Sequence, residues 1–75
     1  MGITEDLADE LAIETIKAAA ELGDDTLFDQ IAQALGATST TTQEAFLTAV
    51  RVRTAQQRAQ KMLADKLARA RAAKP

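Results

Sequence analysis

Residues 42–74, TQEAFLTAVRVRTAQQRAQKMLADKLARARAAK, contain neither glycine nor proline and are rich in alanine. Alanine, leucine, arginine, lysine and glutamine favour helix, whereas glycine and proline end it. Thr41, followed three residues later by Glu44, has the pattern of a capping box that opens a helix. We therefore predict one helix over about 42–72, which would span roughly 45 Å at about 1.5 Å per residue. Chain ends commonly fray, so we expect residues 70–75 to be a frayed tail.

A first helix is predicted over 5–22. Thr4 can cap its start, and Gly23 suits the left-handed conformation that ends many helices. At about 100° per residue, one face of this helix is apolar. The residues of that face are Leu7, Leu11, Thr15, Ala18 and Leu22, widened by Ala8, Ala12, Ile16 and Ala19.

A second, short helix is predicted over 26–35. Asp24 or Asp25 can cap its start, and Gly36 is the expected stop. Apolar residues recur on one side of this segment, with Asp29 and two glutamines on the other. Three helices with short connections predict a single all-α domain over 1–75, a three-helix bundle.

The charge of the chain is divided by position. Residues 1–36 carry nine acids and one base, a net −8, whereas residues 37–75 carry eight bases and two acids, a net +6, and the sum is −2. This division and the length of the third helix suggest two arrangements. In a compact bundle, which we expect, the acidic first helix lies against the basic half of the third helix. In the other arrangement, the C-terminal half of the third helix extends beyond the bundle and pairs with a second chain or another partner. The two arrangements can coexist, as a bundle at the N-terminal end with a dimer seam beyond it.

The third helix also carries an apolar seam with the alternating four- and three-residue spacing of a coiled coil. The seam runs through Ala45, Ala49, Val52, Gln56, Ala59, Leu63, then Lys66 or Leu67, and Ala70. Gln56 would be a polar residue in this seam, and such residues can set register or oligomer number. Little of so short a chain is left to cover the end of the helix. We therefore predict a partner or dimer surface formed by Gln56, Met62, Leu63 and Leu67.

Catalysis and metal binding are not expected. The chain has no histidine and no cysteine, which removes the commonest general base, the commonest metal ligand and thiolate sites. Asp24, Asp25 and Asp29 form the densest carboxylate group, but their positions are those of helix caps and first-turn residues. We therefore expect no enzyme activity, no catalytic residue, no metal site and no cofactor.

One short segment resembles a nucleic-acid-binding motif. Residues 31–39, IAQALGATS, resemble the middle of a bacterial helix-turn-helix, in which a leucine-glycine turn precedes the recognition helix. In that motif an apolar residue follows the glycine by about five or six positions, and here those positions hold Thr41 and Thr42. Glu44 stands in the first turns of the would-be recognition helix, and an acid there repels phosphate.

The sequence thus favours a protein-interaction or self-assembly module, with a homodimer expected. The alternative is a small nucleic-acid-associated regulator built on segment 27–50 and the basic face of the third helix. Its possible phosphate contacts are Arg51, Arg58, Lys66 and Arg69. No apolar run approaches the roughly 20 residues of a membrane span, and the acidic N-terminus is unlike a signal peptide. We expect a cytoplasmic protein that does not bind membranes.

Overall fold

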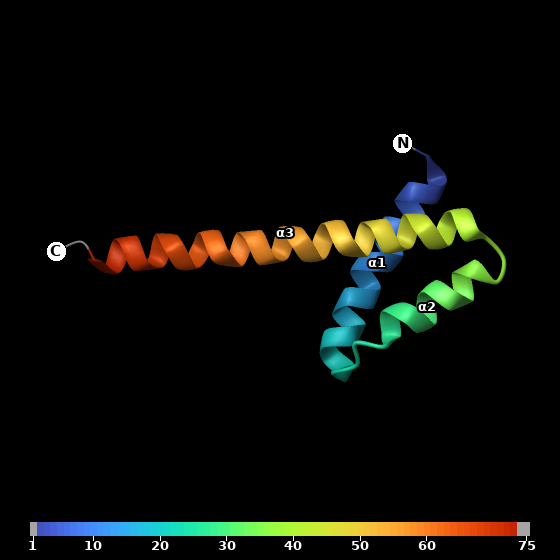
Figure 1. The fold of residues 1–75 in the computed structure, drawn as a ribbon, viewed down its shortest axis with the longest axis horizontal. Helices are drawn as coiled ribbons and strands as arrows, with labels where there is room; N and C mark the ends of the chain where they lie inside the picture. The colour runs from blue at the N-terminus through green and yellow to red at the C-terminus, as the bar shows by residue number, and fades with distance from the viewer. Residues whose placement is uncertain (1, 74–75) are drawn as a thin grey trace.

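The computed structural model describes residues 2–73, and these form three helices joined by short turns (Figure 1). Helix α1 spans Ile3–Leu22, α2 spans Leu27–Gly36 and α3 spans Thr40–Ala73. The predicted all-α, three-helix fold is confirmed. The fraying expected over 70–75 stays a prediction: α3 is helical to Ala73, and the last two residues lie outside the described range.

Gly23 ends α1 as predicted. Its φ of 65° places it in the left-handed region, and its amide donates to the carbonyl of Ala19. Among residues 2–73 no other residue has a positive φ. This conformation strains any residue with a Cβ, so the sequence signal at Gly23 was reliable.

Gly36 was predicted to stop α2 but instead belongs to it as its last residue, with ordinary helical geometry. A glycine stands here because the neighbouring Gln43 side chain leaves no room for a Cβ. A Cβ at this position would lie 2.6 Å from Nε2 of Gln43. That same nitrogen donates a 3.0 Å hydrogen bond to the carbonyl of Ala32, which ties α3 to α2.

The N-terminal caps of α1 and α3 also differ from the prediction. Helix α1 begins at Ile3, two residues earlier than a cap at Thr4 would allow, and the amide of Gly2 donates to the Glu5 carboxylate at 3.0 Å. Helix α3 is capped by Ser39, whose Oγ accepts from the amide of Thr42 at 3.1 Å, and not by Thr41. Several threonines precede α3, and a capping pattern alone cannot choose between adjacent hydroxyl residues.

The predicted cap of α2 at Asp24 or Asp25 is wrong: Thr26 is the N-cap, and it has no side-chain capping hydrogen bond. Asp24 lies two residues before it. Its Oδ1 accepts hydrogen bonds from the amide and the hydroxyl of Thr26, at 3.0 and 2.6 Å. This local turn closes the connection between α1 and α2, and α2 then begins at Leu27.

The core lies where the three helices meet. Phe46 is its one large, fully buried side chain among the described residues, and it packs with Ala8, Ala12 and Ala32. Half-buried apolar side chains surround this cluster: Leu11, Ile31, Leu35, Ala45, Leu47, Ala49 and Val50. Alanines at a crossing let two helix backbones approach closely, and the phenylalanine fills the remaining space.

The buried face of α1 is narrower than predicted. Its buried residues are Ala8, Ala12, Thr15 and Ala19. Leu7 and Leu22 were expected to be in the core, but they are 54% and 68% exposed. Bulky leucines would hold α1 away from α3, so the crossing uses the small residues. Thr15 is accommodated because its hydroxyl donates to the carbonyl of Leu11 at 2.7 Å.

The three helices form a bundle around the N-terminal half of α3, but the expectation that α1 lies along the basic half of α3 is wrong. Helix α1 crosses the N-terminal half of α3 at a steep angle and does not run along it, while α2 lies beside the same half (Figure 1). The other half of α3 projects away from both helices, which gives the molecule extents of 59 × 30 × 13 Å. The second arrangement, in which α3 extends beyond the bundle, is the one that the structure shows.

Candidate self-association surface

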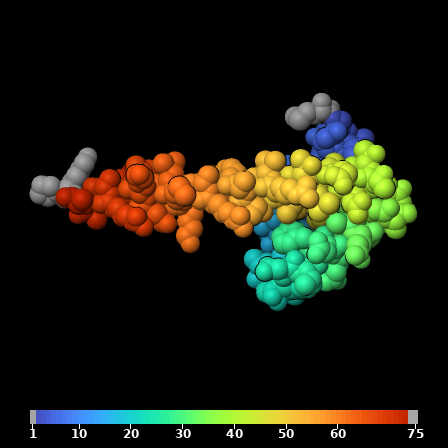
Figure 2. All heavy atoms as spheres, viewed as in Figure 1, coloured from blue at the N-terminus to red at the C-terminus, as the bar shows by residue number. Residues whose placement is uncertain are grey.

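The α3 extension, defined here as residues 55–73, has no cover. Every residue in it is exposed, and the space-filling view shows it as a single rod leaving the bundle (Figure 2). It carries five bases and one acid, a net charge of +4. At about 1.5 Å per residue, its 19 residues extend roughly 28 Å.

Large apolar side chains lie on this extension. Met62, Leu63 and Leu67, which the sequence assigned to a partner surface, are 73%, 61% and 45% exposed. Gln56, the fourth residue of that prediction, is also exposed. Val52, at the edge of the bundle, is 61% exposed.

These residues do not all share one face. At about 100° per residue, Val52, Gln56, Leu63 and Leu67 fall within about 60° of one another. Either Lys66 or Leu67 fits the seventh position of the seam of α3, which follows this direction. We define the seam with Lys66, as Ala45, Ala49, Val52, Gln56, Ala59, Leu63, Lys66 and Ala70, and Leu67 then borders it. Met62 lies about 100° from Leu63 and so belongs to the flank of the seam.

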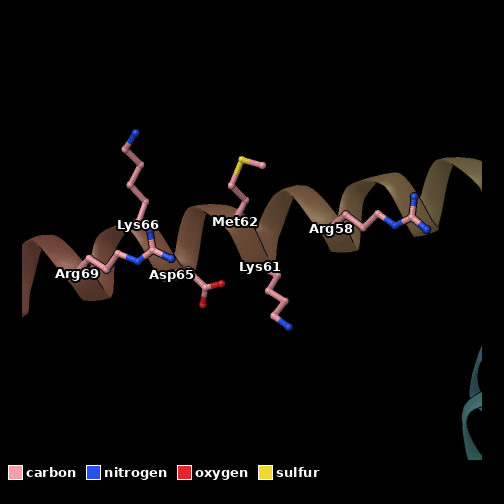
Figure 3. A pocket seen from close by; sticks show the side chains of 6 residues that line it. All are labelled: Arg58, Lys61, Met62, Asp65, Lys66 and Arg69. Carbon is pink, nitrogen blue, oxygen red and sulfur yellow. The ribbon is translucent and has the colours of Figure 1, made fainter.

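The flank around Met62 is open. Its side chains spread away from one another: Met62 and Lys66 project to one side of the helix, Lys61 and Asp65 to the other, and Arg58 and Arg69 lie between (Figure 3). All six come from one helix, so nothing on the opposite side closes the hollow. This arrangement can contact a partner surface but does not enclose a small molecule.

A second surface continues the seam toward the bundle. The acidic groove, as we call it, is lined by four acids, Glu5, Asp6, Asp9 and Glu44, and no base, and its volume is about 570 Å³. The other lining residues come from α3 and include Ala45, Ala49 and Val52 of the seam. Sequence reasoning missed this groove, because it forms only where α1 crosses α3. Its one sequence signal was the cluster of acids in the first turns of α1.

One ion pair borders the acidic groove. Arg53 donates to both carboxylate oxygens of Asp9, at 2.5 and 2.7 Å, and both side chains are partly exposed. The hydrogen bond from Arg53 lowers the pKa of the Asp9 carboxyl, and the same bond raises the pKa of Arg53. The pair joins α1 to α3, and no other ion pair forms within residues 2–73. Most acidic and basic side chains of residues 2–73 therefore have no ion-pair partner within one molecule.

Glu5 is the second acid of the groove with a perturbed pKa. Backbone hydrogen bonds, first from its own amide and then from that of Gly2, lower the pKa of its carboxyl. Both amides belong to the exposed start of α1, where unpaired N–H groups favour a negative charge. This carboxylate therefore stays ionised at neutral pH.

The residues predicted to contact phosphate lie along one side of α3. Arg51 and Arg58 line a groove between α2 and α3 that also contains Asp29, and Lys66 and Arg69 lie further out on the extension. The four basic residues are thus spread along the helix and do not converge on one point.

The comparisons with known proteins add no identification: no family model, no curated protein and no solved structure matches this chain. Within residues 2–73, no helix is long and apolar enough to cross a membrane. The same residues contain no group of three or more acids placed to hold a metal ion.

Proposed function

We propose that this protein is a non-catalytic self-association module and that the α3 extension is its contact surface. The observation that carries the proposal is that every residue over 55–73 is exposed, including the leucines at positions 63 and 67. Most helical stability in proteins comes from the packing of an apolar face against another element. A second helix laid along the seam supplies that packing.

The spacing of the seam supports a helical partner. Alternating steps of four and three residues keep side chains facing a neighbouring helix over several turns. Burial of one leucine side chain contributes about 1.5–3 kcal/mol. Leu63 and Leu67, each present in both copies, would supply most of the apolar contact of such a dimer.

The test is the mass in solution of the wild type and of Leu63→Asp. We expect a wild-type mass twice the 8.0 kDa of one chain, and a monomer for the variant with α1 and α2 still folded. Ala68→Asp is the matched control: it introduces the same charge on the same exposed helix, about 140° away from Leu63. A monomeric wild type, or a Leu63→Asp variant that remains dimeric, would contradict the proposal.

A nucleic-acid-associated role is the second candidate. It is favoured by the net +4 of the extension, whose bases have no acidic partner within the described residues. It is opposed by the acidic groove, which lies beside the start of α3 and repels phosphate. This role predicts binding of DNA or RNA that weakens steeply with salt and is lost in Arg51→Ala/Arg58→Ala. Absence of any gel retardation at low salt would eliminate it.

The cellular location is part of the same proposal. A cytoplasmic homodimer that does not bind membranes fits the sequence and the lack of a membrane-spanning helix in residues 2–73. Fractionation of cells that express the tagged chain would test it.

A further inference from the structure

The spacing of the seam residues along α3 is the same from the N-terminal end as from the C-terminal end. With Lys66 as its seventh residue, the seam has steps of four, three, four, three, four, three and four residues, and reversing the helix superimposes this alternating pattern on itself. The centre of this palindrome lies between Gln57 and Arg58. A helix with such a seam can pair with an antiparallel copy of itself without losing any contact layer.

We infer that two copies of this chain pair through antiparallel α3 helices, so that the basic extension of each copy lies in the acidic groove of the other. The inference rests on the proposed self-association and adds its direction, register and second surface. With the two-fold axis at the centre of the palindrome, four pairs of positions face each other twice. They are Val52 with Leu63, Gln56 with Ala59, Ala49 with Lys66, and Ala45 with Ala70.

Charge selects the antiparallel direction. A parallel pair would place one +4 extension beside another and leave both acidic grooves uncovered. The antiparallel pair places each +4 extension beside the acidic groove, where Glu5, Asp6 and Glu44 form no ion pair within residues 2–73. Like charges held side by side oppose association, whereas complementary surfaces favour it and fix its register.

The charged residues on the two flanks of the seam are also complementary in the antiparallel pair. At about 100° per residue, Arg69 and Glu44 lie on the same flank, and in the antiparallel register their levels along the axis differ by about 3 Å. Arg71 lies on the opposite flank, which is the side on which Arg53 holds α1 through Asp9. Arg71 of one copy therefore approaches Glu5 and Asp6 of the other, the acids that α1 contributes to the groove.

Distances between spin labels test the direction. The chain has no cysteine, so single cysteines can be introduced into the full-length protein without removing others. Ala68→Cys and Gln57→Cys are a matched pair, because both positions are exposed and face away from the seam. In the antiparallel register, the two labels at position 68 are separated by about 32 Å along the axis, and those at position 57 by only about 2 Å.

Each outcome is decisive. A much longer distance at position 68 than at position 57 supports the antiparallel dimer. Equal distances in a dimer of unchanged mass mean a parallel pair, which overturns this inference and leaves the proposed self-association standing. A monomer by mass, with no dipolar signal at either position, overturns both.

A charge exchange tests the groove separately. Arg69→Glu should weaken dimerisation by about tenfold or more, because two symmetry-related pairs become repulsive. Adding Glu44→Arg to the same chain restores opposite charges and should recover most of the affinity. Arg58→Glu is the control, since position 58 lies near the two-fold axis and away from the acidic groove. If Glu44→Arg does not rescue Arg69→Glu, or if Arg58→Glu weakens the dimer equally, the proposed seating in the groove is wrong.

Discussion

At the scale of single residues, the fold depends on one aromatic ring and a few alanines. Phe46 is fully buried and contacts the alanines through which α1 and α2 approach α3. Alanine contributes little area of its own, so its value here lies in the close approach that it permits. The sequence could not show that α1 would bury its alanines and expose Leu7 and Leu22.

Phe46→Ala should cost about 3–5 kcal/mol of unfolding free energy, the usual penalty for such a buried cavity. A domain this small has little stability to lose, so the variant should be largely unfolded. Urea unfolding followed by circular dichroism measures the change. Phe28→Ala is the control, because Phe28 is only half-buried and should cost much less. Equal losses for the two variants would contradict the central role of Phe46.

The Asp9–Arg53 pair predicts a pH dependence of stability. Its hydrogen bonds lower the pKa of Asp9 in the folded state below the unfolded value of about 3.9. The pair therefore stabilises the fold above about pH 4, and this contribution is lost as the pH falls through the lowered pKa. Asp9→Asn should be less stable than the wild type at neutral pH, and the difference should shrink in acid.

Urea midpoints at about pH 7 and about pH 3 measure this difference, on either side of the unfolded pKa of Asp. Glu14→Gln removes a charge from the exposed face of α1 and serves as the control. A wild type and an Asp9→Asn variant that differ by the same amount at both pH values would show that the ion pair does not contribute.

At the scale of elements, α3 is one helix in two environments. Its first half packs against α1 and α2, whereas every described residue of its second half, from 55 to 73, is exposed. The continuous helix was predictable, because no helix-ending residue interrupts 42–74. The residue beyond which α1 and α2 no longer pack against α3 was not predictable, because it depends on the angle at which α1 crosses α3. That angle is set by side-chain packing at the crossing, which periodicity does not describe.

The junction of α2 and α3 offers a test of coupling. In the wild type, Gly36→Ala must displace the Gln43 side chain and break its hydrogen bond to Ala32. When Gln43→Ala has already removed that side chain, Gly36→Ala should stabilise the protein by about 0.5–1 kcal/mol through the better helix propensity of alanine. A double-mutant cycle measures the difference between the two backgrounds. Equal effects in both would mean that Gly36 is not there to accommodate Gln43.

At the scale of the whole molecule, shape and charge act together. The extension projects a net +4 away from a bundle that carries most of the acids. The one ion pair within residues 2–73, Asp9–Arg53, lies inside the bundle and does not involve the extension. We had expected the opposite charges to meet within one chain. The steep crossing prevents this, which leaves them able to meet between chains.

Salt should therefore weaken association without unfolding the bundle. Between about 0.05 M and about 0.5 M salt, screening of the contacts between extension and groove should raise the dissociation constant of the dimer. Leu63 and Leu67, which the proposed dimer would bury, should maintain some affinity. Sedimentation equilibrium at both salt concentrations measures this. A dimer unaffected by salt would argue against pairing of opposite charges between chains.

The sequence by itself determined the number of helices, their approximate bounds and the left-handed stop at Gly23, because helix propensity and a positive φ are local properties of the chain. It also indicated Leu63 and Leu67 as contact residues, from the excess length of the third helix. Only the tertiary structure decided that α1 crosses α3 on its alanines, that Arg53 pairs with Asp9, and that Glu5, Asp6 and Glu44 line one groove. These features join residues that are distant in the sequence, and their positions depend on how side chains pack where the helices cross.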